Sequence, residues 1–227
     1  NAFPHHTNEI AQSESFLGHK WCNYWFHVHH LNNETGKMSK SKGEFLTVSL
    51  LESKGYDPMA YRLFCLQSHY RRNLVFSWEN LDNATVAYEK LIARIATLKQ
   101  DGEVEQEVFA KLKQRFEGAL NGDLNTSVAV TALYDVLKAK CNDATKLALM
   151  EDFDRVLSLN LLEAADKLRR KQAEEEAANA DPEIDALVAA RTEAKKAKKF
   201  AEADRIRDEL KARGIEIIDT PQGTKWR

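Results

Sequence analysis

Two lysines and two serines stand within five consecutive residues, Lys37-Met38-Ser39-Lys40-Ser41, and they carry groups that suit the triphosphate of a nucleotide. A lysine ammonium is a compact charge that can follow a phosphate as it becomes a pyrophosphate leaving group, and a serine hydroxyl adds a neutral hydrogen bond to the same oxygens. Gly36 and Gly43 flank the run and let it move. The pattern predicts a site for adenylyl transfer, although a basic run by itself is more often solvated surface.

A histidine and a glutamate, His5 and Glu9, stand four residues apart near the start of the chain. Pro4 suits the first turn of a helix there, and Gly18 suits its end. Residues at this spacing share a helix face, so an imidazole and a carboxylate could form half of a zinc site. The same pair is more often an ordinary surface contact, and the spacing alone leaves both interpretations open.

Taken together, these segments resemble the cysteinyl-tRNA synthetase family, whose catalytic domain carries an HHxNE helix, then a YWMH segment, then KMSKS. Here they read HHTNE over residues 5–9, Tyr24-Trp25-Phe26-His27, and Lys37 to Ser41. Near the C-terminus, residues 203–208 and 219–227 resemble the family's last helix and closing hairpin. The resemblance therefore covers essentially the whole chain.

The sequence departs from the family pattern in four residues and in one missing motif. Thr7, His29, Lys42 and Glu44 stand where the family commonly has Glu, Gly, Leu and Asn, and the family's His-x-Gly-His nucleotide motif does not occur. The first residue is Asn1 rather than a methionine. We therefore expect a C-terminal fragment, inactive alone, of a longer synthetase whose N-terminal half holds the missing motif and two cysteine ligands.

The resemblance implies ATP-dependent ligation of L-cysteine to tRNA(Cys) through a cysteinyl adenylate, with Mg²⁺ accompanying ATP. It implies that residues 37–41 bind ATP and that Lys37 and Lys40 are the catalytic groups. It also implies that His5 and Glu9 hold Zn²⁺ in the full-length protein, which would separate cysteine from serine because a thiolate is the better zinc ligand. In this chain that metal site is expected to be incomplete.

At the other end, the resemblance implies tRNA anticodon binding by Lys195, Phe200, Asp204 and Asp219. Single-stranded bases are read by stacking and by hydrogen bonds to their edges, and carboxylates can accept from exocyclic amines. From the residues alone, Phe200 could instead belong to a core, Asp204 could pair with Arg207, and Asp219 could shape a turn. For each of these three residues, the structural role and the anticodon-binding role both stay open.

The elements that position these residues are predicted to be mainly helical. The resemblance implies that residues 1–80 form the end of a class I Rossmann-like catalytic domain with connecting helices. Residues 81–172 are expected to form a helical bundle, 173–182 a linker, and 183–227 a small mixed α/β anticodon-binding domain.

Local signals predict where several helices begin and which residues are buried. Asp57, Ser77 and Asn125 can cap helices, and Gly214 can end one before a strand pair at 215–218 and 224–226. The predicted bundle core consists of apolar residues at helical spacing: Phe109, Leu112, Phe116, Leu120, Leu124, Leu133 and Leu137.

A basic and aromatic cluster, His69-Tyr70-Arg71-Arg72, lies in a region of positive charge. Residues 37–72 hold seven Lys/Arg against three Asp/Glu, which suits phosphate or the acceptor end of RNA. Packing against the protein surface is the more common role of such a cluster, so both interpretations stay open.

The composition excludes some classes of protein. The 227 residues are 43% hydrophobic and 30% charged with a net charge of −2, and no apolar run is long enough to cross a bilayer. Cys22, Cys65 and Cys141 are far apart and lack CxxC spacing, so neither a disulfide framework nor a self-contained zinc site is indicated. We expect a cytoplasmic monomer that binds neither membrane nor DNA.

Two alternatives stay open at this stage. One is a non-catalytic tRNA-binding paralogue or processed module. The other is the cysteine ligase of mycothiol synthesis, against which the terminal hairpin argues.

Overall fold

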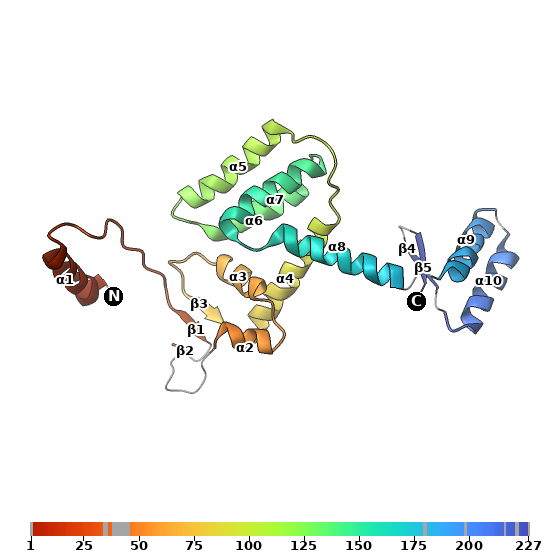
Figure 1. Ribbon diagram of the computed structural model, residues 1–227, viewed down its shortest axis with the longest axis horizontal. Coiled ribbons are helices and arrows are strands. Elements are labelled where there is room, and N and C mark those ends of the chain that lie inside the picture. Colours follow the sequence, from red (N-terminus) through yellow and green to blue (C-terminus); the bar gives the residue numbers. More distant parts are fainter. Residues whose placement is uncertain are drawn as a thin grey trace. The chain divides into compact units, whose positions relative to one another are not determined.

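The computed structural model describes residues 2–33, 36–37, 46–178, 181–197, 199–215, 217–220 and 223–226 (Figure 1). By its internal contacts the chain divides into two compact units, Asn1–Glu163 and Ala164–Arg227. The structure is mainly helical, which confirms the predicted fold class. No helix among the described residues combines the length and the apolar composition that a bilayer crossing requires.

The chain begins with a short π-helical turn, η1 (Ala2–His6), followed by helix α1 (Thr7–Leu17). Pro4 lies inside η1, so the regular α-helix begins three residues later than Pro4. Gly18 ends α1 with a left-handed φ of 73°, and its N–H donates to the Glu14 carbonyl at 2.8 Å. The prediction that Gly18 ends this helix is confirmed, since glycine adopts this conformation without steric cost.

A small sheet follows, with strands β1 (Leu31–Asn33), β2 (Gly36–Lys37) and β3 (Leu74–Phe76) in the order β2-β1-β3. β1 pairs antiparallel with β2 and parallel with β3. A cluster of buried side chains supports the sheet and joins it to the helices: Leu51, Phe64, Phe76, Leu81 and Ala84.

Six further helices lie wholly within the described residues of the first unit: α2 (Val48–Ser53), α3 (Pro58–Leu66), α4 (Trp78–Ala96), α5 (Gln106–Asn121), α6 (Thr126–Lys138) and α7 (Asp143–Leu157). Three predicted caps are confirmed. The side chains of Asp57, Ser77 and Asn125 accept the backbone N–H groups that would otherwise be left unpaired at the starts of α3, α4 and α6, at 2.7, 3.1 and 3.3 Å.

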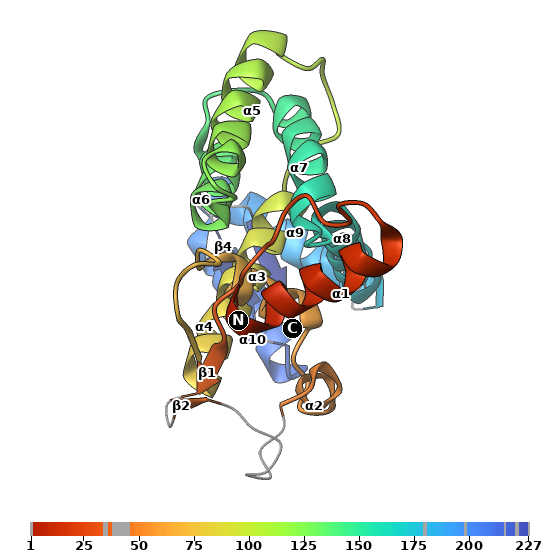
Figure 2. The same cartoon turned by 90° about the vertical axis from the view of Figure 1, so that its left-hand side faces the viewer.

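Helices α5, α6 and α7 pack against one another, and α4 and α6 both contact α3 (Figures 1 and 2). The rings of Phe116 and Phe153 stack in this bundle with their centroids 4.0 Å apart. Phe116 and Leu133 are buried as predicted. Leu124 was predicted to be core and is 47% exposed, because it lies in the turn after α5 with a left-handed φ of 51°.

The second unit contains most of α8 (Leu161–Ala178), then α9 (Pro182–Lys196), α10 (Phe200–Ala212), β4 (Ile217–Thr220) and β5 (Gly223–Trp226). Helices α9 and α10 pack through Val188, Ile206 and Leu210. Strands β4 and β5 form an antiparallel hairpin, so the predicted strand pair after Gly214 is confirmed. The predicted domain boundaries at 80/81 and 172/173 fall inside α4 and α8.

Candidate functional site

The lysine–serine run begins at the edge of the sheet. Lys37 ends β2, where its backbone pairs with Asn32 of β1. The Asn32 side-chain amide donates to Asn73 just before β3, 2.6 Å from Nδ2 to Oδ1. Beyond the run, the Thr47 hydroxyl caps α2. Strand β2 therefore positions the start of the run and α2 follows it in the chain, while the Lys37 side chain and residues 38–45, which include Met38, Ser39, Lys40 and Ser41, lie outside the described residues.

The two predicted metal ligands lie on consecutive elements. His5 is in η1 and Glu9 is in the first turn of α1, and both side chains are exposed. An imidazole nitrogen and a carboxylate oxygen are both suitable zinc donors. Within the described ranges, no group of three or more His, Cys, Asp or Glu side chains is arranged to hold a metal ion. The described donors thus amount to two of the four that zinc normally takes.

A histidine pair next to this position was not predicted. His27 Nε2 lies 3.0 Å from His6 Nδ1, and the Trp25 ring stacks on His6 with centroids 4.1 Å apart. Partial burial lowers the pKa of His6, and the nearby His27 lowers it further. One ring must donate and the other accept, so this contact requires a neutral acceptor ring. It holds the segment after α1 against η1.

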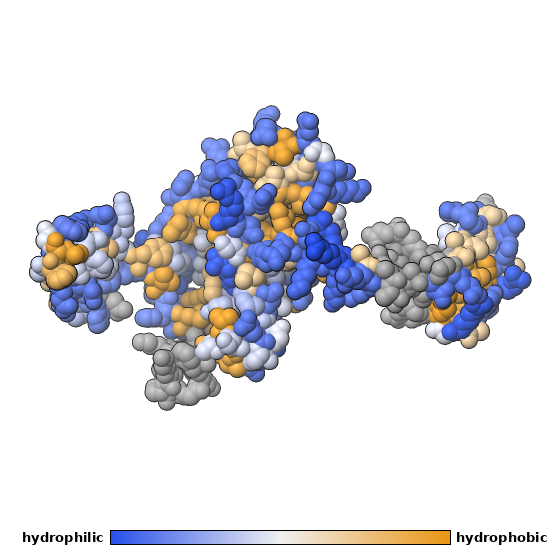
Figure 3. Space-filling view, viewed as in Figure 1, coloured by the Kyte–Doolittle hydropathy of each residue, from blue (hydrophilic) through white to orange (hydrophobic). Residues whose placement is uncertain are grey.

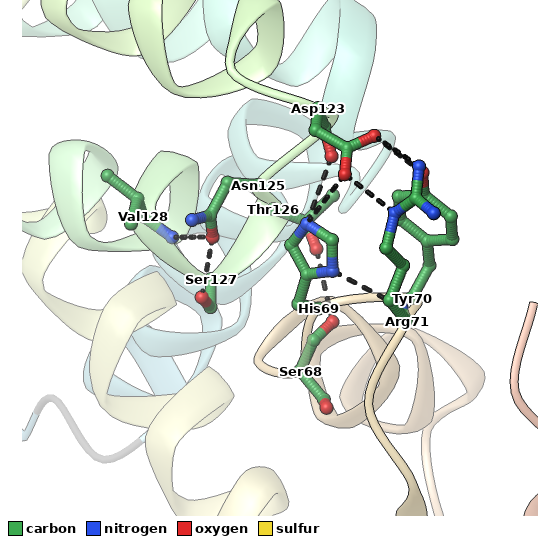
Figure 4. A network of polar contacts seen from close by, with 9 residues as sticks. All are labelled: Ser68, His69, Tyr70, Arg71, Asp123, Asn125, Thr126, Ser127 and Val128. Carbon is green, nitrogen blue, oxygen red and sulfur yellow. Dashed lines mark hydrogen bonds and ion pairs between the residues drawn. The ribbon is translucent and has the colours of Figure 1, made fainter.

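A second group of polar contacts joins the basic cluster to the turn between α5 and α6 (Figure 4). Arg71 holds the Asp123 carboxylate with two hydrogen bonds, 2.7 Å from Nε to Oδ2 and 3.2 Å from Nη2 to Oδ1. Tyr70 donates its hydroxyl to the same carboxylate at 2.5 Å. His69 Nε2 donates to the Asp123 carbonyl at 3.0 Å, while its Nδ1 accepts the Arg71 backbone N–H at 3.2 Å. This pattern fits the neutral Nε2–H form of His69.

The same network extends toward the segment before β1. Phe26 stacks on Tyr70 with ring centroids 4.4 Å apart, and the His29 backbone N–H donates to the Tyr70 carbonyl at 2.9 Å. Asp123 therefore connects the helical bundle to the segment that leads into the sheet. Because Arg71 is held by Asp123, the RNA contact predicted for this cluster would have to compete with an existing ion pair, and it stays a prediction.

Replacing Asp123 by asparagine is expected to remove a pH-dependent part of the stability. Hydrogen bonds from Arg71 and Tyr70 lower the pKa of Asp123 from its ordinary 3.8 to about 2. A carboxylate whose pKa is lowered by folding stabilises the fold fully above its unfolded pKa, and this contribution disappears as the pH falls to the folded value. The difference in melting temperature between wild type and Asp123→Asn should thus be constant above about pH 5 and shrink toward pH 2.

Asp101→Asn serves as the control for that experiment, because Asp101 is exposed in the loop between α4 and α5. It should leave the melting temperature nearly unchanged over the same pH range. If the difference in melting temperature between wild type and Asp123→Asn grew on acidification, the result would contradict the prediction that the ionised Asp123 carboxylate stabilises the fold.

In the second unit, the four predicted anticodon-binding residues lie on three elements. Phe200 begins α10 and is 63% exposed, which excludes the alternative that it is core. Asp204 lies one turn further along α10, and its carboxylate pairs with Arg207 at 3.1 Å, as the structural alternative expected. Lys195 is exposed in the last turn of α9. Asp219 lies in β4 opposite Thr224, and its side chain is outside the described residues.

Comparison with known proteins gives matches at both ends of the chain. Residues 1–86 match the family described as tRNA synthetases class I (C) catalytic domain, and residues 178–227 match the family described as cysteinyl-tRNA ligase anticodon binding domain. The chain is 41% identical over 240 residues to the cysteine–tRNA ligase of Novosphingobium aromaticivorans, covering 98% of this chain and 48% of the relative. It is also 41% identical over 248 residues to that of Symbiobacterium thermophilum, covering 99% and 50%. The chain thus spans about half the length of the curated relatives it matches.

Proposed function

The chain belongs to the cysteinyl-tRNA synthetase family, and on this premise we propose that the protein ligates L-cysteine to tRNA(Cys) in an ATP-dependent reaction. The observation that carries the proposal is the presence, in one chain, of a match to the catalytic domain containing the lysine–serine run and a match to the anticodon-binding domain. The first match corresponds to activation of the amino acid, and the second corresponds to selection of the tRNA. A cytoplasmic location, as expected for protein synthesis, belongs to the same proposal.

In the proposed first step, the carboxylate of cysteine attacks the α-phosphate of Mg²⁺-bound ATP, and the bond to the β-phosphate breaks to release pyrophosphate. In the second step, a ribose hydroxyl at the end of the tRNA attacks the acyl carbon and AMP leaves. Neither step needs a covalent bond to the protein. What the site has to supply is alignment of the reactants and stabilisation of the charge growing on the phosphates, and Lys37 and Lys40 are proposed for this role.

The proposal is tested by cysteine-dependent ATP–pyrophosphate exchange, measured on this chain and on an intact protein that contains it. Exchange with cysteine in the intact protein, and none with serine, is the expected result. A second candidate is a non-catalytic tRNA-binding protein or module, which the match of residues 178–227 to the anticodon binding domain favours. An intact protein that binds tRNA(Cys) and shows no exchange would establish that candidate instead.

Zinc is proposed for the intact protein, with His5 and Glu9 as two of its ligands. When bound, the metal would hold the thiolate of the substrate cysteine and so favour it over serine. The described part of this chain offers two donors at this position, so we expect the purified 227-residue chain to bind zinc substoichiometrically. Metal analysis after dialysis measures this directly. One tightly held zinc ion per chain would contradict the assignment of the remaining ligands to another part of the protein.

Phe200→Ala is expected to weaken tRNA(Cys) binding by roughly 5- to 150-fold, the range that corresponds to the loss of one base stacked on an aromatic ring. The side chain is 63% exposed, so its removal should leave the fold intact. Filter binding or fluorescence anisotropy at one fixed salt concentration measures the effect. Val156→Ala, which removes an exposed apolar side chain from α7, is the control and should change affinity little. Equal losses for the two variants would contradict a stacking role for Phe200.

A further inference from the structure

The connection between α7 and α8 is short and adopts an unusual backbone conformation. Only residues 158–160 separate the two helices, and we call residues 157–161 the α7–α8 joint. Within it, Ser158 and Asn160 both have a left-handed φ, 51° and 57°. Both residues carry a Cβ, which makes this conformation costly, so it persists only where the surrounding contacts hold it. The contacts of the joint should therefore reveal what holds it.

Asp154, in the last turn of α7, makes three of these contacts. Its carboxylate accepts the backbone N–H of Leu159 at 2.6 Å through Oδ1 and that of Leu161 at 2.8 Å through Oδ2. Its backbone carbonyl accepts the N–H of Ser158 at 2.8 Å. Leu161 is the first residue of α8, and its N–H has no partner within that helix. One residue thus ties the end of α7 to the beginning of α8.

Two other helices of the first unit hold the carbonyl groups of the joint. Arg62 of α3 donates its Nε–H to the Leu157 carbonyl at 2.6 Å, and Tyr88 of α4 donates its hydroxyl to the Leu159 carbonyl at 2.8 Å. The side chains of Leu157, Leu159 and Leu161 are fully buried. Polar contacts in such surroundings are stronger than contacts in water. The joint is therefore fixed to α3, α4 and α7 together.

Helix α8 is anchored at its beginning. Leu161 and Ala165 are fully buried, whereas residues 171–175 are exposed, and Figure 3 shows blue, hydrophilic side chains along this later part of the helix. The helix has 18 residues and is therefore about 27 Å long. A change of about 10° in the direction of its first turn moves its far end by roughly 5 Å. The region that matches the anticodon binding domain starts at residue 178, the last residue of α8.

We infer that Asp154 is a positioning residue for the transfer of cysteine to tRNA, because it fixes the direction in which α8 begins. The inference rests on the proposed function. One tRNA has to reach the catalytic domain and the anticodon-binding domain at the same time, and binding through two linked sites is lost when the geometry forbids it. Asp154 acts through the joint and touches no reactant. Activation of cysteine by ATP does not involve the anticodon-binding domain, so it does not depend on the joint.

Asp154→Asn in an intact protein containing this chain tests the inference, because it keeps the size of the side chain and replaces one accepting oxygen by a donor. Cysteine-dependent ATP–pyrophosphate exchange should stay within about twofold of wild type. The kcat/KM for aminoacylation of tRNA(Cys) should fall by roughly 10- to 100-fold, mainly through a higher KM for tRNA. A short RNA with the acceptor end but no anticodon should be acylated equally well by both proteins.

A second measurement does not depend on catalysis. In the 227-residue chain, spin labels are placed on non-canonical residues at Lys111 of α5 and Glu174 of α8, both of which are exposed. Electron–electron double resonance then gives the distribution of distances between the two labels. The distribution should be broader for Asp154→Asn than for wild type. Amide hydrogen exchange at Leu159 and Leu161 should be faster in the same variant.

Glu151→Gln is the matched control, since Glu151 is an exposed carboxylate on α7. It should behave as wild type in every measurement. If Asp154→Asn does not fold, Tyr88→Phe removes a single hydrogen bond from the joint, and the ratio of aminoacylation to exchange should then fall by a smaller factor.

Three outcomes overturn the inference. Exchange and aminoacylation could fall in proportion, as they would after a general loss of folded protein. The short RNA could lose as much as tRNA(Cys), or the label distances could match those of wild type. If the intact wild type shows no exchange, the proposed function fails, and the label distances still decide whether Asp154 fixes the start of α8.

Discussion

Lys40→Ala in an intact protein containing this chain is expected to slow cysteine-dependent ATP–pyrophosphate exchange by roughly 10²- to 10³-fold, the cost of losing one preorganised contact to charge that develops in a transition state. The loss should fall mainly on kcat, because the pyrophosphate carries more charge as it leaves than it does in bound ATP. Steady-state kinetics with varied ATP separates the effect on kcat from the effect on KM.

Lys42→Ala is the control for this experiment. It removes the same charge two residues further along the chain, outside the run from Lys37 to Ser41. Its effect on exchange should be small, since bulk positive charge near the site is only weakly felt at physiological salt. Similar losses for the two variants would show that net charge, rather than a specific contact, accounts for the role of the run.

Phe153→Ala is expected to lower the free energy of unfolding of the first unit by about 3–5 kcal/mol, the usual cost of removing a large buried aromatic side chain. Phe153 is fully buried and stacks on Phe116 between α5 and α7, so its removal leaves a cavity in the contact between two helices. Urea unfolding followed by circular dichroism gives the midpoint and slope for this unit and for the wild type.

Phe153→Leu should lose less, because it keeps part of the buried volume. Val156→Ala, three residues away on the exposed side of α7, should stay within about 0.5 kcal/mol of wild type. A loss below about 1 kcal/mol for Phe153→Ala would mean that the bundle closes around the cavity and that the stacked pair does not hold α5 to α7.

The features that could be predicted from the sequence are those that depend on neighbours along the chain. Asp57, Ser77 and Asn125 begin helices because their side chains reach backbone groups two or three residues ahead. Strand β3 was not predicted because it has only three residues, and its pairing with β1 spans more than forty positions. Such a strand is defined by its partner and has no periodicity of its own.

The residues of the candidate site can likewise be separated into those that the sequence predicts and those that it does not. The lysine–serine run follows from residue type and local spacing, whereas the residues alone left open whether Phe200 is exposed, and the structure decides that. Two contacts could not be predicted from local patterns because they join residues far apart in the sequence. His6 and His27 are 21 positions apart, and Arg71 and Asp123 are 52 positions apart. The role of Asp123 is also difficult to predict because its backbone adopts a left-handed φ of 66° in the turn after α5. That conformation is tolerated by aspartate but is not required by the sequence around it.

The shared use of Asp123 by Arg71 and Tyr70 has a consequence for how this protein can vary over time. If Asp123 is replaced during evolution, Arg71 and Tyr70 lose the carboxylate that accepts their hydrogen bonds. If Arg71 is replaced, Asp123 loses its cationic partner. Contacting residues of this kind have non-additive effects on stability. Substitutions at positions 71 and 123 are therefore expected to be inherited as pairs, and a collection of related sequences should record them as a correlated change.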